Sequence, residues 1–225
     1  MKRAVNATPF IPALKRDALT PVYDVLIRLT LPEMRFKRHL LDAAVIAAGH
    51  RVLDVGCGTG TLLRLAAGQS TGATFVGIDP DPAILGRARP KLADLPEVSV
   101  EVGSATKLPF DSGSFDRVLS TLAFHHLRGD EKAEAMREIL RVLRPGGEFH
   151  LGDFGAPDTL ATRITSFLTE RIGGEHVQEN FQGLLPSMLA RAGFTGVEET
   201  GRFGTMFGVL RTIRAVKTRE RSQIP

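Results

Sequence analysis

The sequence contains a single cysteine, Cys57, among 225 residues. One thiol excludes a disulfide within the chain and any zinc site that needs two thiolates. Apolar runs of the roughly 18 to 20 residues that span a membrane are absent, and residues 1–16 lack the apolar core of a secretory signal. His, Asp and Glu residues form no cluster typical of a metal site. We expect a cytoplasmic protein without a resident metal.

The composition is that of a folded globular protein. Hydrophobic residues make up 43% and charged residues 24% of the chain, which suits one α/β domain of this length. The net charge is +4, and from Gly201 to the end six basic residues stand against one acid, Glu220. These residues fit a solvated tail. The alternative is peripheral contact with an anionic partner such as a lipid surface or RNA.

Short apolar segments alternate with helical patterns along the chain. Residues 1–32 contain four prolines and predict loops and short helices. Strands are predicted at 51–55, 73–78, 98–102, 115–120, 148–151, 195–199 and 205–216. Helices are predicted at 33–48, 61–67, 82–93, from a cap at Asp130 to Leu143, at 159–172 and at 181–192. This alternation predicts a doubly wound, mostly parallel seven-stranded sheet with an antiparallel last strand.

The strongest local signal is the glycine-rich segment from Val52 to Gly60, V-L-D-V-G-C-G-T-G. Glycines at the end of a strand let the backbone turn sharply and approach a ligand. The spacing G-x-G-x-G differs from the dinucleotide pattern G-x-G-x-x-G, and no G-K-[ST] follows. Asp54 would repel a pyrophosphate but attract the ammonium of an amino acid. The segment therefore predicts a cofactor with an amino-acid moiety.

A second acid, Asp79, ends the second predicted strand, nineteen residues after Gly60. A carboxylate there can accept hydrogen bonds from both hydroxyls of a ribose. The alternative is that Asp79-Pro80-Asp81 is only a helix-capping turn. Since Asp81 can serve as the cap, we expect Asp79 to be free for a ligand.

Together these segments resemble class I S-adenosylmethionine-dependent methyltransferases, in particular the branch with the ubiquinone and menaquinone C-methyltransferases. The resemblance covers residues 50–152 and implies the Rossmann-like methyltransferase fold. It rests on V-L-D-V-G-C-G-T-G, G-I-D-P, G-S-A, L-P-F, S-F-D, S-T-L-A-F-H-H-L and L-R-V-L-R-P-G-G. S-adenosyl-L-methionine is the cofactor that this resemblance implies.

The resemblance also implies roles for individual residues. The methionine part of the cofactor would lie against Gly56, Gly58 and Gly60, with Asp54 orienting the loop or holding the amino group. The ribose would be bound by Asp79.

The remaining cofactor contacts follow in the same way. The adenine edge would lie at Ser104 and Ala105; the family usually has Asp where Ser104 stands, so this contact lacks charge assistance. Ile84 or Pro80 would pack on the adenine face, and Thr121 and Leu122 would border the sulfonium. Tyr23 would lie in the N-terminal region that caps the cofactor.

Methyl transfer from a sulfonium is an in-line displacement, so the protein mainly aligns the reactants and excludes water. A base is needed only where the acceptor must lose a proton. His125 and His126 are the candidate catalytic residues, at the end of the fourth predicted strand. The alternative is that one or both only pack beneath the loop.

We expect one domain over residues 1–225: an N-terminal helical cap (1–48), a cofactor-binding core (49–152) and substrate-side helices with closing strands (153–225). The predicted acceptor is a small hydrophobic or quinone-like metabolite, and nucleic acid is not expected as a partner. Three alternatives stay open: a phospholipid headgroup methyltransferase, an RNA methyltransferase and a cofactor-binding protein without activity.

Overall fold

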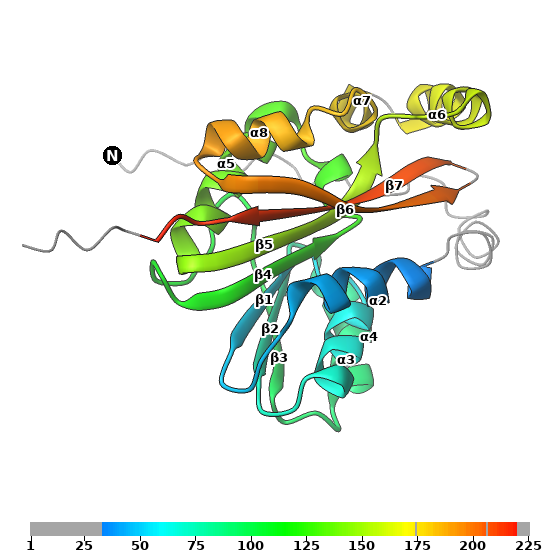
Figure 1. Ribbon diagram of the computed structural model, residues 1–225. Helices are drawn as coiled ribbons and strands as arrows, with labels where there is room; N and C mark the ends of the chain where they lie inside the picture. Colours follow the sequence, from blue (N-terminus) through cyan, green and yellow to red (C-terminus); the bar gives the residue numbers. More distant parts are fainter. Residues whose placement is uncertain (1–32, 174, 206, 220–225) are drawn as a thin grey trace, which may run out of the picture.

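The computed structural model describes residues 33–173, 175–205 and 207–219, which form one seven-stranded sheet with helices on both faces (Figure 1). The strands are β1 (Arg51–Val55), β2 (Thr74–Asp79), β3 (Val98–Val102), β4 (Phe115–Thr121), β5 (Leu143–Gly155), β6 (Thr195–Thr205) and β7 (Gly208–Val216). Their order is β3-β2-β1-β4-β5-β7-β6, and only β7 runs antiparallel to its neighbours. This arrangement confirms the predicted fold.

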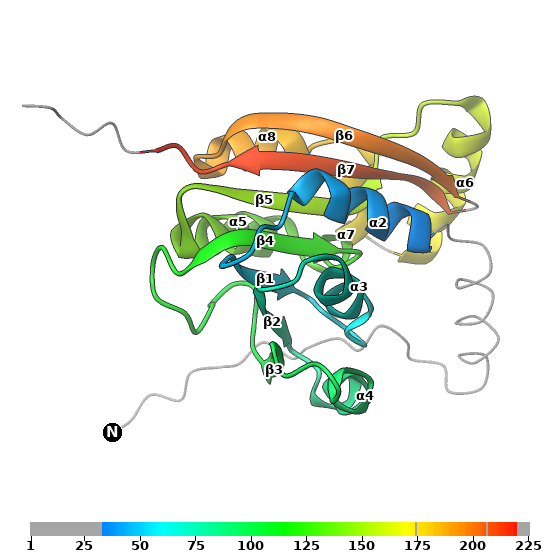
Figure 2. The ribbon, with the colours of Figure 1, turned by 60° about the horizontal axis from the view of Figure 1, so that its bottom comes forward.

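Two helical layers enclose the sheet (Figure 2). The first comprises α2 (Glu33–Ala44), α3 (Thr61–Gln69) and α4 (Pro82–Leu92), whose leucines and alanines share one buried cluster with β1 and β2. The second comprises α5 (Gly129–Val142) and α8 (Leu185–Ala192), which form a second cluster with β4 and β5. Because both faces are covered, the central strands β1 and β4 are buried along most of their length, whereas β3 at the edge of the sheet is largely exposed.

The order of the strands determines where a ligand can bind. From β1 the chain passes outward to β2 and β3 and then returns to β4 on the other side of β1. Open α/β sheets bind ligands beyond the carboxyl ends of the strands at such a reversal. The glycine-rich loop follows β1, and the 3-10 helix η1 (Phe124–His126) follows β4 shortly after its end. Both predicted functional segments therefore lie at this switch point.

Several predicted element boundaries were wrong. The helix predicted to reach residue 48 ends at Ala44, and Val45 adopts the left-handed region with φ 44°. The helix predicted at 181–192 is α8, which begins only at Leu185, after a turn in which Gly183 has φ 72°; the preceding helix α7 (Glu175–Phe181) was not predicted. The α5 helix starts at Gly129, where Glu131 accepts from the Arg128 N–H, so Asp130 is not its cap.

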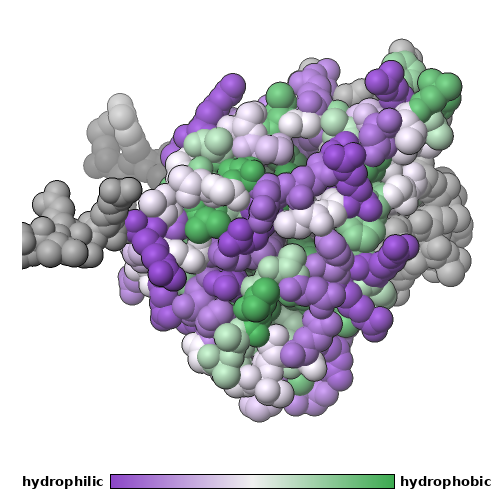
Figure 3. Space-filling model, in the orientation of Figure 1, coloured by the Kyte–Doolittle hydropathy of each residue, from purple (hydrophilic) through white to green (hydrophobic). Residues whose placement is uncertain are grey.

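One helix presents apolar side chains to solvent. Leu160, Ile164 and Phe167 of α6 (Leu160–Gly173) are 75%, 55% and 54% exposed. Figure 3 shows hydrophobic atoms at the end of the molecule where α6 lies in Figure 1. Within the described part of the chain, every helix is too short or too polar to cross a membrane.

Candidate active site

The loop after β1 is built on three glycines with positive φ: 73° at Gly56, 53° at Gly58 and 72° at Gly60. The N–H groups of Gly56 and Cys57 donate to the carbonyl of Ile78 in β2, each over 2.9 Å, and so hold the loop against the neighbouring strand. A Cβ on Gly58 would meet no atom within 4 Å. Gly58 thus leaves room for a ligand among the described residues, and its contact with the cofactor stays a prediction.

Asp54 is buried, with 1% of its surface exposed, and neither carboxylate oxygen has a hydrogen-bond partner among the described residues. Burial raises its pKa to about 7, an effect that the charge of Lys37 opposes and that of Asp79 reinforces. An unpaired buried carboxylate is costly unless a cation or donors reach it. Asp54 therefore fits the ammonium of an amino-acid moiety, directly or through water.

Asp79 ends β2 beside the loop. One of its oxygens accepts from the N–H of Gly58 and the other from the N–H of Asp81, each over 3.0 Å. Burial raises its pKa, partly offset by these two bonds. Asp81 is the cap of α4, accepting from the N–H of Ala83 over 2.8 Å, as predicted.

The Asp79 carboxylate also anchors the glycine loop, a role that the sequence did not indicate. A carboxylate has about four lone-pair positions. Two of them serve the Gly58 and Asp81 amides, so hydroxyl groups of a ribose can still donate to Asp79.

The predicted adenine contacts lie one strand further out. Ser104 follows β3, whose Val102 pairs with Asp79, so Ser104 and Ala105 lie at the same edge of the sheet as Asp79. The Ser104 side chain is exposed, and its hydroxyl lies 2.9 Å from that of Thr106. Pro80 is exposed beside them. Tyr23 lies outside the described residues.

The end of β4 approaches the glycine loop from the other side. Thr121 is buried, and Leu122 adopts the left-handed region with φ 55°, unusual for a residue with a Cβ. The Leu122 N–H donates to the carbonyl of Gly152 over 2.8 Å. A Cβ on Gly56 would lie 2.5 Å from the Cβ of Ala123, so the two loops are in contact. Strained backbone of this kind is concentrated at functional sites.

The two candidate histidines differ in their surroundings. Nδ1 of His125 lies 2.8 Å from Oδ1 of Asp153. The backbone N–H of His125 donates to Oδ2 of the same carboxylate over 3.2 Å. His126 is exposed, with its ring centroid 4.0 Å from that of His125. Asp153 is buried in β5, and burial alone would raise its pKa. The charge of His125 and hydrogen bonds from His125 and the Phe154 N–H outweigh burial and lower that pKa.

Asp153 was missed from the sequence, because the fifth strand was predicted only at 148–151. In the structure β5 extends to Gly155, and a buried acid in a sheet covered on both faces calls for a partner. Only the fold shows that the partner is His125, 28 residues earlier in the chain.

Phenylalanines gather at the same end of the sheet. Phe154 and Phe181 have ring centroids 5.5 Å apart, and Phe154 lies edge-on to His125 at 5.2 Å. Their apolar cluster comprises Phe36, Phe154, Phe181 and Leu210, with Leu122, Phe203 and Phe207 packed against it. Three other large apolar residues lie away from this cluster: Phe167 is exposed on α6, Met34 is exposed on α2, and Met188 packs in the cluster around α5.

Four basic residues near the C-terminus have partners among the residues that the structure describes. Arg202 and Arg211 pair with Glu199, and Arg214 pairs with Glu148 and Glu198. Lys217 donates to the carbonyls of Arg141 and Leu143. Four of the six basic residues that follow Gly201 therefore bind groups of the protein itself. Contact with an anionic partner stays a prediction without support from these residues.

Comparisons with known proteins agree with this geometry. A methyltransferase domain model matches residues 52–147. A Synechocystis protein described as a methyltransferase is 34% identical over 83% of this chain and 85% of its own length. A demethylmenaquinone methyltransferase of Thermus thermophilus is 33% identical over 83% of this chain and 94% of its own.

Solved structures share the fold. The YcgJ protein of Bacillus subtilis superposes with a TM-score of 0.69 at 18% identity, over 83% of this chain and 99% of that one. A likeness at 18% identity shows the fold alone. The family is shown by the sequence identity to the two curated relatives, which extends over most of both chains. The chain belongs to the class I methyltransferases, enzymes that use S-adenosylmethionine as the methyl donor.

Proposed function

We propose that this enzyme methylates a small hydrophobic, quinone-like ring. The observation that carries the proposal is the phenylalanine cluster around Phe154, which meets Leu122 and His125 beside the glycine loop. Aromatic walls with a few polar groups are typical of sites for apolar ligands. A relative that acts on demethylmenaquinone, at 33% identity, supports the same class of acceptor.

The proposed cofactor contacts are those expected from the sequence. Asp54 and the backbone of Gly56, Gly58 and Gly60 bind the methionine part, and Asp79 binds the ribose. Ser104, Ala105 and Pro80 border the adenine, Thr121 and Leu122 border the sulfonium, and Tyr23 contributes from the N-terminal cap. The proposed division is 1–48 as cap, 49–152 as core and 153–225 as the acceptor side, in a protein of the cytoplasm.

Bound S-adenosylmethionine supplies a methyl group on a positively charged sulfur. The protein then has to hold the acceptor in line and remove its proton. His125 is the proposed base: with Nδ1 directed at Asp153, its Nε2 is the nitrogen left to accept the proton of an acceptor hydroxyl. Asp153 acts through His125 as a positioning residue, fixing the ring and stabilising the imidazolium. His126 is exposed beside it and can pass the proton to water.

A transfer assay with labelled methyl tests the proposal. The wild type and His125→Gln are incubated with S-adenosylmethionine and one acceptor at a time: a naphthohydroquinone, phosphoethanolamine or transfer RNA. Label in the naphthohydroquinone, reduced about 10² to 10⁴-fold in the variant, is the expected result. Label in either other acceptor alone would replace the proposal with one of the alternatives. Absence of transfer to every acceptor would favour a binding protein.

A further inference from the structure

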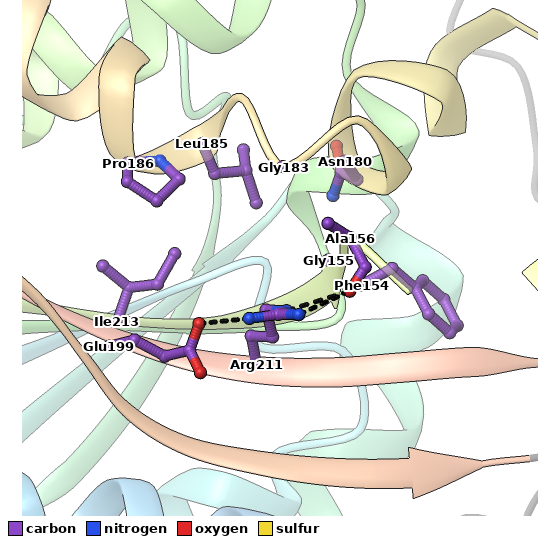
Figure 4. Close-up of a pocket in the computed structure, with 10 residues that line it drawn as sticks. All are labelled: Phe154, Gly155, Ala156, Asn180, Gly183, Leu185, Pro186, Glu199, Arg211 and Ile213. Carbon is purple, nitrogen blue, oxygen red and sulfur yellow. Dashed lines mark hydrogen bonds and ion pairs between the residues drawn. The ribbon is translucent and has the colours of Figure 1, made fainter. Parts of the chain in front are cut away.

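Three side chains in the described part of the chain bury polar atoms that have no hydrogen-bond partner: Asp54, Ser166 and Asn180. Buried polar groups are almost always paired, so each of them can bind a ligand. Asn180 lines a cavity of about 110 Å³ at the α7–α8 turn (Figure 4), but the ring of Phe154 stands between that cavity and His125. Of the three, only Asp54 is charged and lies at the glycine-rich loop.

A buried cation lies near Asp54 without pairing with it. Lys37 of α2 is 8% exposed, and its Nζ lies 2.7 Å from Oε1 of Glu33, one turn earlier in the same helix. Burial raises the pKa of Asp54, and the charge of Lys37 opposes that rise, so the two charges act on each other. The Asp54 carboxylate nevertheless has no partner among the described residues. Two opposite charges are thus buried near one another and kept apart.

Neighbouring contacts place Lys37 at the ligand-binding edge of the sheet. Phe36, the residue before it, packs so closely on β5 that a Cβ on Gly152 would lie 2.4 Å from the phenylalanine ring. The carbonyl of Gly152 accepts from the N–H of Leu122, the residue that follows β4. Leu122 also packs against the apolar cluster that contains Phe36. This part of α2 therefore lies at the carboxyl ends of the strands, as the glycine-rich loop does.

The two separated charges match those of an amino acid. An amino-acid group carries an ammonium and a carboxylate on the same carbon, and charge-assisted hydrogen bonds are the strong ones. Asp54 suits the ammonium, and Lys37 suits the carboxylate. A lysine ammonium has several donors, and among the described residues only Glu33 accepts from Lys37. Glu33 therefore holds Lys37 in place while donors remain for a ligand.

We propose that Lys37 binds the carboxylate of the methionine part of S-adenosylmethionine, and that Lys37 and Asp54 together select ligands whose sulfur carries a zwitterionic amino-acid chain. This inference rests on the proposed placement of the cofactor at Asp54 and adds the residue that recognises the opposite charge. It gives α2 a direct contact with the methyl donor.

Calorimetric titration with two matched ligands tests the assignment. S-adenosylmethionine carries both charges, whereas decarboxylated S-adenosylmethionine keeps the ammonium and lacks only the carboxylate. We expect the wild type to bind S-adenosylmethionine at least about tenfold more tightly, because the decarboxylated ligand loses a hydrogen bond between charged groups. Lys37→Met removes the charge and keeps an unbranched side chain, so this variant should bind the two ligands about equally.

Arg38→Met is the control, because Arg38 is the adjacent cation of α2 and is exposed. It should keep the preference of the wild type. An equal loss of affinity for both ligands in Lys37→Met would mean that Lys37 only keeps Asp54 ionised, and would overturn the proposal. Equal binding of the two ligands by the wild type would also overturn it, and this comparison needs no variant that must fold.

The titrations contain no methyl acceptor, so their outcome is independent of the transfer assay. Binding of S-adenosylmethionine without preference over the decarboxylated ligand would remove the role of Lys37 and leave the proposed function intact. Absence of S-adenosylmethionine binding by the wild type would contradict both.

Discussion

At the residue scale, the buried and unpaired Asp54 makes the stability of the enzyme depend on pH. Its folded-state pKa of about 7 lies above its ordinary value of 3.8. Between these values the folded state holds more protons than the unfolded one, so the contribution of Asp54 to stability falls as pH rises through this window. The full difference between the two pKa values corresponds to a loss of at most about 4 kcal/mol in the free energy of unfolding.

Asp54→Asn should therefore unfold at higher urea concentration than the wild type at about pH 8, and the two proteins should converge toward about pH 4. The gain should be a few kcal/mol or less, measured by urea titration at both pH values. The variant should also bind S-adenosylmethionine more weakly. A variant less stable than the wild type at high pH would mean that Asp54 is already paired.

A second residue-scale prediction concerns Asp153. Asp153→Asn leaves the shape of the site unchanged but removes the charge that holds His125. We expect kcat to fall by about 10² or more with little change in KM. In wild-type protein, ¹⁵N shifts of His125 should show the proton on Nδ1 of the neutral ring. His126→Gln is the control and should lose less than tenfold; equal losses in both variants would remove the distinction between the histidines.

At the element scale, the end of α2 carries avoidable strain. Val45 is 70% exposed and has φ 44°, a region that β-branched residues avoid. Asn adopts this region more readily and is common just after a helix. Val45→Asn should raise the free energy of unfolding by about 1 kcal/mol, measured by urea titration. Val45→Ala, which lacks a polar side chain that can hydrogen-bond the nearby backbone, should gain less. A loss of stability in the Asn variant would contradict the argument.

The attachment of α7 depends on a buried charge. Nζ of Lys132 in α5, 0% exposed, lies 2.9 Å from a carboxylate oxygen of Glu179 in α7. Glu179→Ala removes a charged partner of that buried cation and should destabilise the protein by about 2 to 3 kcal/mol, somewhat below the usual cost for a fully buried pair because Glu179 is partly exposed.

The exposed pair between Arg64 and Asp94 supplies the comparison for Glu179→Ala. Asp94→Ala should cost about 1 kcal/mol or less. Thermal unfolding of both variants measures the contrast. Similar losses in the two would show that Lys132 does not depend on Glu179.

Elements with a strong local pattern were predictable, and contacts between distant segments were not. The apolar strand before Gly56 and the spacing to Asp79 indicate both the fold and the cofactor edge. The pairing of His125 with Asp153 depends on β4 lying beside β5, which no local pattern contains. The cavity at Asn180 depends on the turn at Gly183, inside a segment predicted as continuous helix.

At the scale of the whole molecule, one reversal of strand order brings the parts of the enzyme together. Because β1 lies between β2 and β4, its glycine loop contacts Ile78 on one side and Ala123 on the other. In the proposed assignment, the β2 side provides Asp79 for the cofactor, and the β4–β5 side provides His125 and the phenylalanines for the acceptor. This assignment puts the methyl donor and the acceptor on opposite sides of the glycine loop.

The most direct test of this account is calorimetric titration of S-adenosylmethionine into the wild type, Asp79→Ala and Asp94→Ala. Asp79 is proposed to bind the ribose, whereas Asp94 is exposed and pairs with Arg64. We predict micromolar binding by the wild type and Asp94→Ala and a loss of at least about tenfold in Asp79→Ala. Equal affinity in all three, with Asp79→Ala still folded, would contradict the placement of the cofactor between β1 and β2.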